Sequence, residues 1–82
     1  MDRETINVTL ESYNNMTKNV IISFEIIDNI NRKRRAIRKI YNLITLDKMN
    51  EVAIEGDYYL KLLHTKGWTE WVKNEIKKLE NL

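Results

Sequence analysis

The chain of 82 residues contains no cysteine and no proline, only two glycines and a single histidine. Without cysteine there is no disulfide and no thiolate ligand for a metal. Gly56 and Gly67 are too few and too far apart to build a glycine-rich loop that cradles phosphates. His64 has no carboxylate motif beside it, which favours a surface histidine over a metal ligand or a general base. These absences predict a protein that is not an enzyme and that uses no metal and no cofactor.

Long hydrophobic runs are also missing. The most apolar stretch, Val20 to Ile30, is too short to span a bilayer and contains Glu25 and Asp28. The opening segment, Met1 to Glu11, is polar and acidic, unlike a signal peptide. We therefore expect neither a membrane span nor export, and the lack of cysteine fits a cytoplasmic location.

What is present is the composition of one folded domain over residues 1–82, with 43% hydrophobic and 32% charged residues. Thr5 to Leu10 alternates between apolar and polar side chains, and Val20 to Ile27 does the same with many β-branched residues. The polar segment Glu11 to Asn19 suits a connection, so the pattern predicts a β-hairpin. An all-α alternative stays open, with a long helix from about residue 11 to 45, because apolar residues also recur there at helical spacing.

Helical patterns dominate the rest of the chain. The predicted helices are Asn31 to Ile44, Leu46 to Glu55, Asp57 to Thr65 and Trp68 to Leu79. Asp28 or Asn29 is the predicted cap of the first helix, and Thr45 is that of the second. The predicted fold is therefore α+β, with an N-terminal β-hairpin packed against three or four short helices. The expected core includes Phe24, Ile37, Ile40, Trp68, Val72 and Ile76.

The most unusual feature is a run of six cations in the eight residues from Arg32 to Lys39. On a helical wheel most of them fall in one half, a candidate binding strip made of Arg32, Arg34, Arg35, Arg38, Lys39 and Asn42. These cations have no acidic partner three or four residues away, and they lie near a helix N-terminus, where the dipole prefers anions. Arginine forks also match phosphate or carboxylate. This placement of like charges would destabilise a helix, and nothing nearby compensates for it, so the pattern predicts a binding role. The alternative is that the cations form a solvated surface with no partner.

Two kinds of partner fit such a strip. One is nucleic acid or a nucleoprotein complex, although no named nucleic-acid motif is present. The other is an acidic protein, bound through the strip or through aromatic residues that are not needed in the core. The candidate interface aromatics are Tyr58, Tyr59 and Trp71, with core packing as the competing interpretation. A small core and an exposed aromatic pair also make a homodimer a reasonable expectation.

The segment Ile6-Asn7-Val8-Thr9-Leu10-Glu11-Ser12-Tyr13 resembles the start of many small uncharacterised proteins from phages of Gram-positive hosts. It covers about a tenth of the chain and includes no catalytic residue. The resemblance implies a phage accessory protein that acts in the cytoplasm of the host cell. It also brings transcriptional regulators, inhibitors of host enzymes and anti-CRISPR or other anti-defence proteins into consideration. The sequence thus predicts a small binding protein that engages nucleic acid or a nucleoprotein, or alternatively inhibits a host enzyme or defence system.

Overall fold

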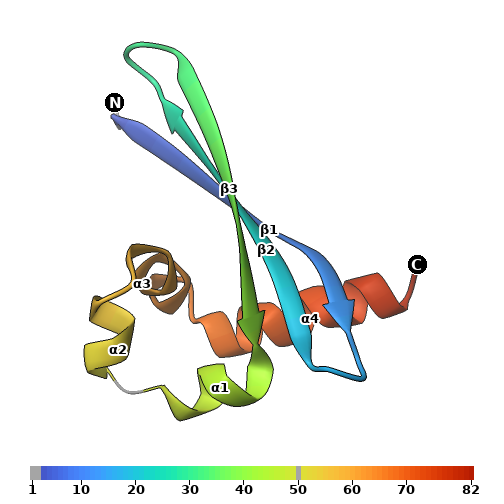
Figure 1. Ribbon diagram of the computed structural model, residues 1–82. Coiled ribbons are helices and arrows are strands. Elements are labelled where there is room, and N and C mark those ends of the chain that lie inside the picture. The colour runs from blue at the N-terminus through green and yellow to red at the C-terminus, as the bar shows by residue number, and fades with distance from the viewer. Residues whose placement is uncertain (1–2, 50) are drawn as a thin grey trace.

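The computed structural model describes residues 3–49 and 51–82, apart from the side chain of Glu51. Within this range a three-stranded sheet is followed by short helices (Figure 1). The elements are β1 (Glu4–Asn14), β2 (Asn19–Asp28), β3 (Lys33–Asn42), α1 (Leu43–Lys48), α2 (Glu51–Glu55), α3 (Tyr58–Thr65) and α4 (Trp68–Glu80). The predicted α+β class is therefore confirmed, and the all-α alternative is wrong.

The sheet is antiparallel, with the strand order β1-β2-β3. The predicted pairing of Thr5–Leu10 with Val20–Ile27 is confirmed. Strand β1 is longer than predicted, because it continues to Asn14 through a bulge between Leu10 and Ser12. Both β1 and β3 lie at an edge of the sheet, and each is paired along its inner side only.

The prediction of a basic helix over Asn31–Ile44 is wrong, since most of this segment is strand β3. In a helix, cations three or four positions apart share a surface and repel one another, whereas adjacent side chains of a strand point to opposite faces. Ile37, Ile40 and Tyr41 are also residue types that strands favour. The repulsion between these cations therefore disfavours a helix over this segment.

The helix caps predicted around this segment are also wrong. Asn42, not Thr45, is the cap of α1, because its side-chain oxygen accepts hydrogen bonds from the backbone N–H groups of Ile44 and Thr45. The single helix predicted from Leu46 to Glu55 is instead the separate helices α1 and α2.

The two C-terminal helices agree with the sequence prediction. Asp57 caps α3 by accepting hydrogen bonds from the backbone N–H groups of Tyr59 and Leu60. Helix α4 begins at Trp68, after Gly67 has turned the chain with a φ of 66°. A positive φ favours glycine, so Gly67 allows the sharp junction between α3 and α4.

The hydrophobic core lies between the helices and one face of the sheet, which we call the helix-side face. Its buried residues are Leu10, Val20, Ile22, Phe24, Tyr41, Leu46, Leu60, Leu63 and Val72. The predicted burial of Phe24 and Val72 is confirmed. Ile40 is 67% exposed, contrary to prediction, because on a strand it points away from the face that holds its neighbour Tyr41. Three other predicted core residues are only partly buried, namely Ile37, Trp68 and Ile76.

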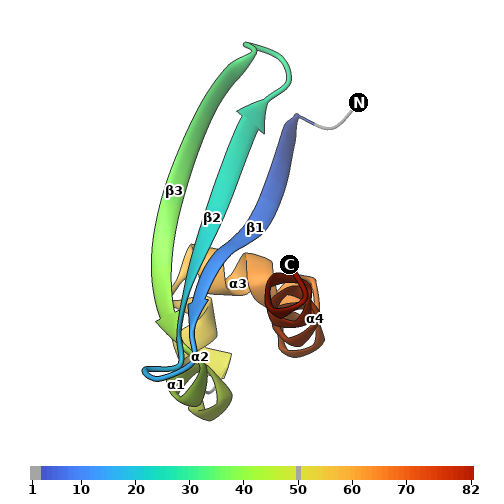
Figure 2. The same ribbon diagram turned by 90° about the vertical axis from the view of Figure 1, so that its right-hand side faces the viewer.

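The helices cover one face and the lower part of the sheet, as Figure 2 shows. The opposite face, which we call the outer face, faces away from the helices. The end of the sheet that carries the β2–β3 turn projects beyond the helical layer. The radius of gyration is 13.6 Å, compared with about 12 Å expected for a compact chain of this length. The projecting end of the sheet explains this excess.

Candidate functional site

The β2–β3 turn forms the tip of the projecting sheet. The Asp28 carboxylate accepts hydrogen bonds from the backbone N–H groups of Ile30, at 2.9 Å, and Asn31, at 3.1 Å. The Asn31 side-chain amide donates to the same carboxylate at 3.0 Å. The two bonds from Asn31, and then the one from Ile30, lower the pKa of Asp28, so this side chain is ionised at neutral pH. Asp28 therefore accepts backbone N–H groups as the predicted helix cap would, but it does so in a turn.

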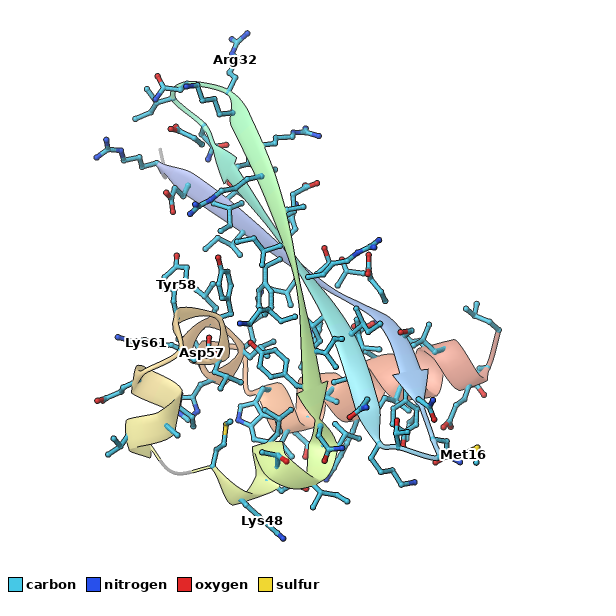
Figure 3. The ribbon with its side chains drawn as sticks, viewed as in Figure 1. Met16, Arg32, Lys48, Asp57, Tyr58 and Lys61 are labelled. Carbon is cyan, nitrogen blue, oxygen red and sulfur yellow. The ribbon has the colours of Figure 1, made fainter. Side chains whose placement is uncertain are left out.

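Arg32 ends this turn with a φ of 56°, a left-handed conformation that costs a non-glycine residue free energy. Its side chain points away from the rest of the molecule at the tip (Figure 3). The start of β1 is tied to the same turn, since the Asn29 backbone N–H donates to the Arg3 carbonyl at 3.0 Å. The side-chain amide of Asn29 also donates to the hydroxyl of Thr5 at 2.9 Å. The fold thereby adds Arg3 to the cations at the tip, a residue that the sequence pattern did not identify.

Strand geometry distributes the cations of β3 over both faces of the sheet. The register places Lys33, Arg35 and Lys39 on the helix-side face, in line with Asp28, Ile26 and Ile22 of β2. Arg34 and Arg38 lie on the outer face. The continuous strip predicted from the helical wheel is therefore wrong, and Lys33, which that wheel left out, lies beside the other cations.

We call Arg3 and Arg32–Arg35 the basic arm. Its five cations are accompanied by two carboxylates at the same end of the sheet, Glu4 and Asp28. Among the described residues, this end of the sheet therefore carries an excess of three positive charges. Among residues 3–49 and 51–82, no residue of the basic arm forms a salt bridge. A local excess of positive charge therefore lies at the projecting end of the sheet.

Arg38 differs from the basic arm because a carboxylate already neutralises it. Its Nε lies 2.9 Å from one carboxylate oxygen of Glu11, and its Nη2 donates to the other at 3.2 Å. Glu11 lies at the bulge of β1 and follows Leu10 of the helix-side face, so its side chain is on the outer face with Arg38. Arg38 is thus less suited to binding an external anion than the sequence alone suggested.

The candidate aromatic residues separate into a core pair and one exposed ring. The ring of Tyr59 packs against the fully buried Phe24, with centroids 5.0 Å apart, and the Lys39 Nζ lies 5.6 Å from the centroid of the Tyr59 ring. Tyr58 is 49% exposed and meets Tyr59 edge-on, with centroids 5.3 Å apart. Trp71 is partly buried and packs against the core. Only Tyr58 therefore presents a largely open ring.

Comparisons with protein-family models, with curated proteins and with solved structures gave no match. The site is accordingly interpreted from its own chemistry.

Asn42 has a structural task. Besides capping α1, its side-chain amide donates to the Thr17 carbonyl at 2.9 Å and to the Asn19 side-chain oxygen at 3.0 Å. These bonds join the end of β3 to the β1–β2 turn, far from the basic arm. Asn42 therefore lies apart from the cations with which the sequence pattern had grouped it.

The described part of the chain offers little support for a metal site, a membrane span or a pocket for a small anion. No group of three or more histidine, cysteine, aspartate or glutamate side chains there could hold a metal ion. His64 is exposed, as the sequence predicted. Among the described residues, no helix has the length and apolar character needed to cross a membrane.

An open depression of about 330 Å³ on the basic arm has both acidic and basic residues in its lining, with Glu4 and Asp28 near Lys33 and Arg35. Such mixed walls are poorly suited to enclosing a small anion.

Proposed function

We propose that this protein binds nucleic acid, with backbone phosphates contacting the basic arm. The observation that carries the proposal is the set of five cations, without salt bridges among the described residues, at an end of the sheet that projects beyond the helices. Four of the five are arginines, whose planar forks pair with phosphate oxygens at two points. Placing so much like charge together is unfavourable for the isolated protein, and a bound polyanion removes that repulsion.

The edge position of β3 supports a phosphate chain as the ligand. Side chains of Arg34 and Arg35 leave this edge strand towards opposite faces. A polymer of negative charges that follows the open edge therefore meets cations from both sides in turn. A single small anion would contact only one side.

Two other roles predict different behaviour. Charged side chains on an edge strand prevent sheets from pairing with one another, and this role needs no ligand. An acidic protein segment could add to the same edge as an extra strand. Neither role requires affinity for free nucleic acid, so direct binding measurements separate them from the proposal.

The test measures binding to short single-stranded and double-stranded DNA and RNA over a series of salt concentrations. About four phosphate contacts would give a log–log slope near −2.8 for single strands and near −3.6 for duplex DNA. The variant Arg34→Glu/Arg35→Glu should bind much more weakly to every sequence, and its salt slope should be smaller by about 1.4 for single strands and about 1.8 for duplex DNA. Arg38 is left unchanged because its reversal would set a carboxylate against Glu11.

The matched control is Lys48→Glu/Lys77→Glu, which changes the net charge by the same amount. Both lysines are exposed and belong to α1 and α4, and Lys48 lies at the opposite end of the molecule from Arg32 (Figure 3). This control should keep most of the affinity. The proposal is wrong if the parent binds no nucleic acid at low salt, or if the control loses as much affinity as the arm variant.

A further inference from the structure

We propose that the nucleic acid is single-stranded and that the ring of Tyr58 stacks on one of its bases. This inference rests on the proposed function, and it adds the class of nucleic acid and a residue outside the basic arm. It starts from an exposed aromatic ring that the core does not need.

The ring of Tyr58 is exposed but supported. Tyr58 is 49% exposed at the first position of α3, and its edge-on contact with Tyr59 has an interplanar angle of 74°. Tyr59 in turn packs on Phe24, which is fully buried. A row of three rings thus leads from the core to the surface and holds Tyr58 in position before any ligand arrives. A ring that is already ordered loses little conformational entropy when it binds.

Cations lie on the same side of the sheet as this ring. Lys39 contacts the Tyr59 ring from the helix-side face of β3. Arg35 is on that same face, two paired rows farther out than Phe24, where it pairs with Ile26. Figure 3 shows Tyr58 on the side of α3 that faces the projecting end of the sheet. A strand whose phosphates follow Arg35 and Lys39 therefore passes close to the exposed ring.

An exposed aromatic ring beside cations favours single-stranded over double-stranded nucleic acid. In a double helix each base is covered on both faces by its neighbours, so no base face is available to Tyr58. A single strand can turn one base out of its stack, and stacking on aromatic side chains is a general way in which proteins bind single strands. Because every base has an aromatic face, this contact predicts little dependence on sequence.

The experiment measures the affinity of the full chain for a labelled single-stranded oligothymidylate and for a DNA duplex of the same length. The parent should prefer the single strand. Tyr58→Ala should weaken single-strand binding by about 5- to 150-fold, the range set by the loss of one stacked base. Duplex binding should change little. Tyr58→Phe keeps the ring and should bind like the parent.

Two further measurements separate stacking from charge and from misfolding. The salt slope of Tyr58→Ala should equal that of the parent, because a stacked base releases no counterion. Met16→Ala is the control for loss of an exposed apolar side chain, since Met16 is 94% exposed in the β1–β2 turn. Thermal unfolding should show that Tyr58→Ala stays folded. If it does not, Tyr58→Leu, which keeps apolar bulk without a ring, should show the same selective loss.

The outcomes of this experiment distinguish the two proposals. Equal affinity of the parent for single strand and duplex, or single-strand binding that Tyr58→Ala leaves unchanged, overturns the stacking inference and leaves arm binding in place. If the parent binds neither nucleic acid, both proposals fail. In that case, loss of an acidic protein complex in Tyr58→Ala would point to a protein interface instead.

Discussion

Replacing Tyr41 by phenylalanine should make the protein more stable. Tyr41 is 8% exposed, and within the described chain its hydroxyl has no hydrogen-bond partner. A hydroxyl buried without a partner costs about 1–3 kcal/mol. Tyr41→Phe removes this group and keeps the ring in the core. We expect the free energy of unfolding to rise by about 1 kcal/mol and the melting temperature by about 4–8 °C.

The same replacement should change the response to alkaline pH. Burial, followed by the negative charges of Asp57 and Tyr59, raises the pKa of Tyr41 above that of an exposed tyrosine. The unfolded chain therefore loses this proton near pH 10, while the folded protein still holds it. Below pH 10 the hydroxyl is neutral in both states and pH has no effect through it, whereas above pH 10 ionisation of the unfolded chain alone lowers the free energy of unfolding. At pH 11 the parent should have lost about 1.4 kcal/mol more than Tyr41→Phe.

Urea unfolding at pH 8 and pH 11 tests both parts. Tyr13→Phe is the control, because the Tyr13 hydroxyl is nearer the surface and donates to the Asn15 side chain at 3.2 Å. Its stability should stay within about 0.5 kcal/mol of the parent. The reasoning is refuted if Tyr41→Phe is destabilised by 1 kcal/mol or more (about one lost hydrogen bond), or if the pH-dependent difference is absent.

Two further predictions test the core and the α3–α4 junction. Leu63→Ala removes a fully buried side chain and should cost about 2–5 kcal/mol in urea unfolding, whereas Ile40→Ala should cost less than about 0.5 kcal/mol. Comparable losses would mean that Ile40 is buried after all. Gly67→Ala should lower the free energy of unfolding by about 1–2 kcal/mol because its φ is positive, while Gly56→Ala, which meets only ordinary contacts at 3.6 Å, should be nearly neutral. Equal effects at both glycines would contradict the backbone argument.

The hairpin and the last two helices could be predicted because each has a single clear period. Val20–Ile27 alternates with period two, and this alternation matches its burial in β2. Asp57 and Gly67 marked the start and end of α3 by short-range backbone chemistry. These signals depend only on neighbouring residues, so they survive without knowledge of the rest of the fold.

Strand β3 could not be predicted in the same way because its charges mask the period. Arg35 and Lys39 lie on the helix-side face, where apolar residues are expected, so the alternation of a half-buried strand is lost. Asp28 added to the error, because a carboxylate that accepts from the second and third following N–H groups caps turns as well as helices. Only the availability of the free edge of β2 decides the outcome, and that is a tertiary property.

The candidate site was predicted in part. The cations between Arg32 and Arg35 were identified, since their clustering is visible in any conformation. Their distribution over two faces, the addition of Arg3 and the neutralisation of Arg38 by Glu11 all require the strand pairing. Residues distant in the sequence could not be grouped by spacing alone.

The packing of the last helix on the first strand has a consequence for how the chain folds. Leu10 and Val72 share the core although 62 residues separate them, whereas the strands pair with their immediate neighbours in the chain. Local hairpins close quickly, and contacts across a long loop close late. During synthesis the part of the apolar face that α4 covers, next to β1, therefore stays open to water until α4 has left the ribosome. Until then the nascent chain exposes an apolar surface of the kind that chaperones bind. The sooner α4 packs on the sheet, the less time the chain has to aggregate.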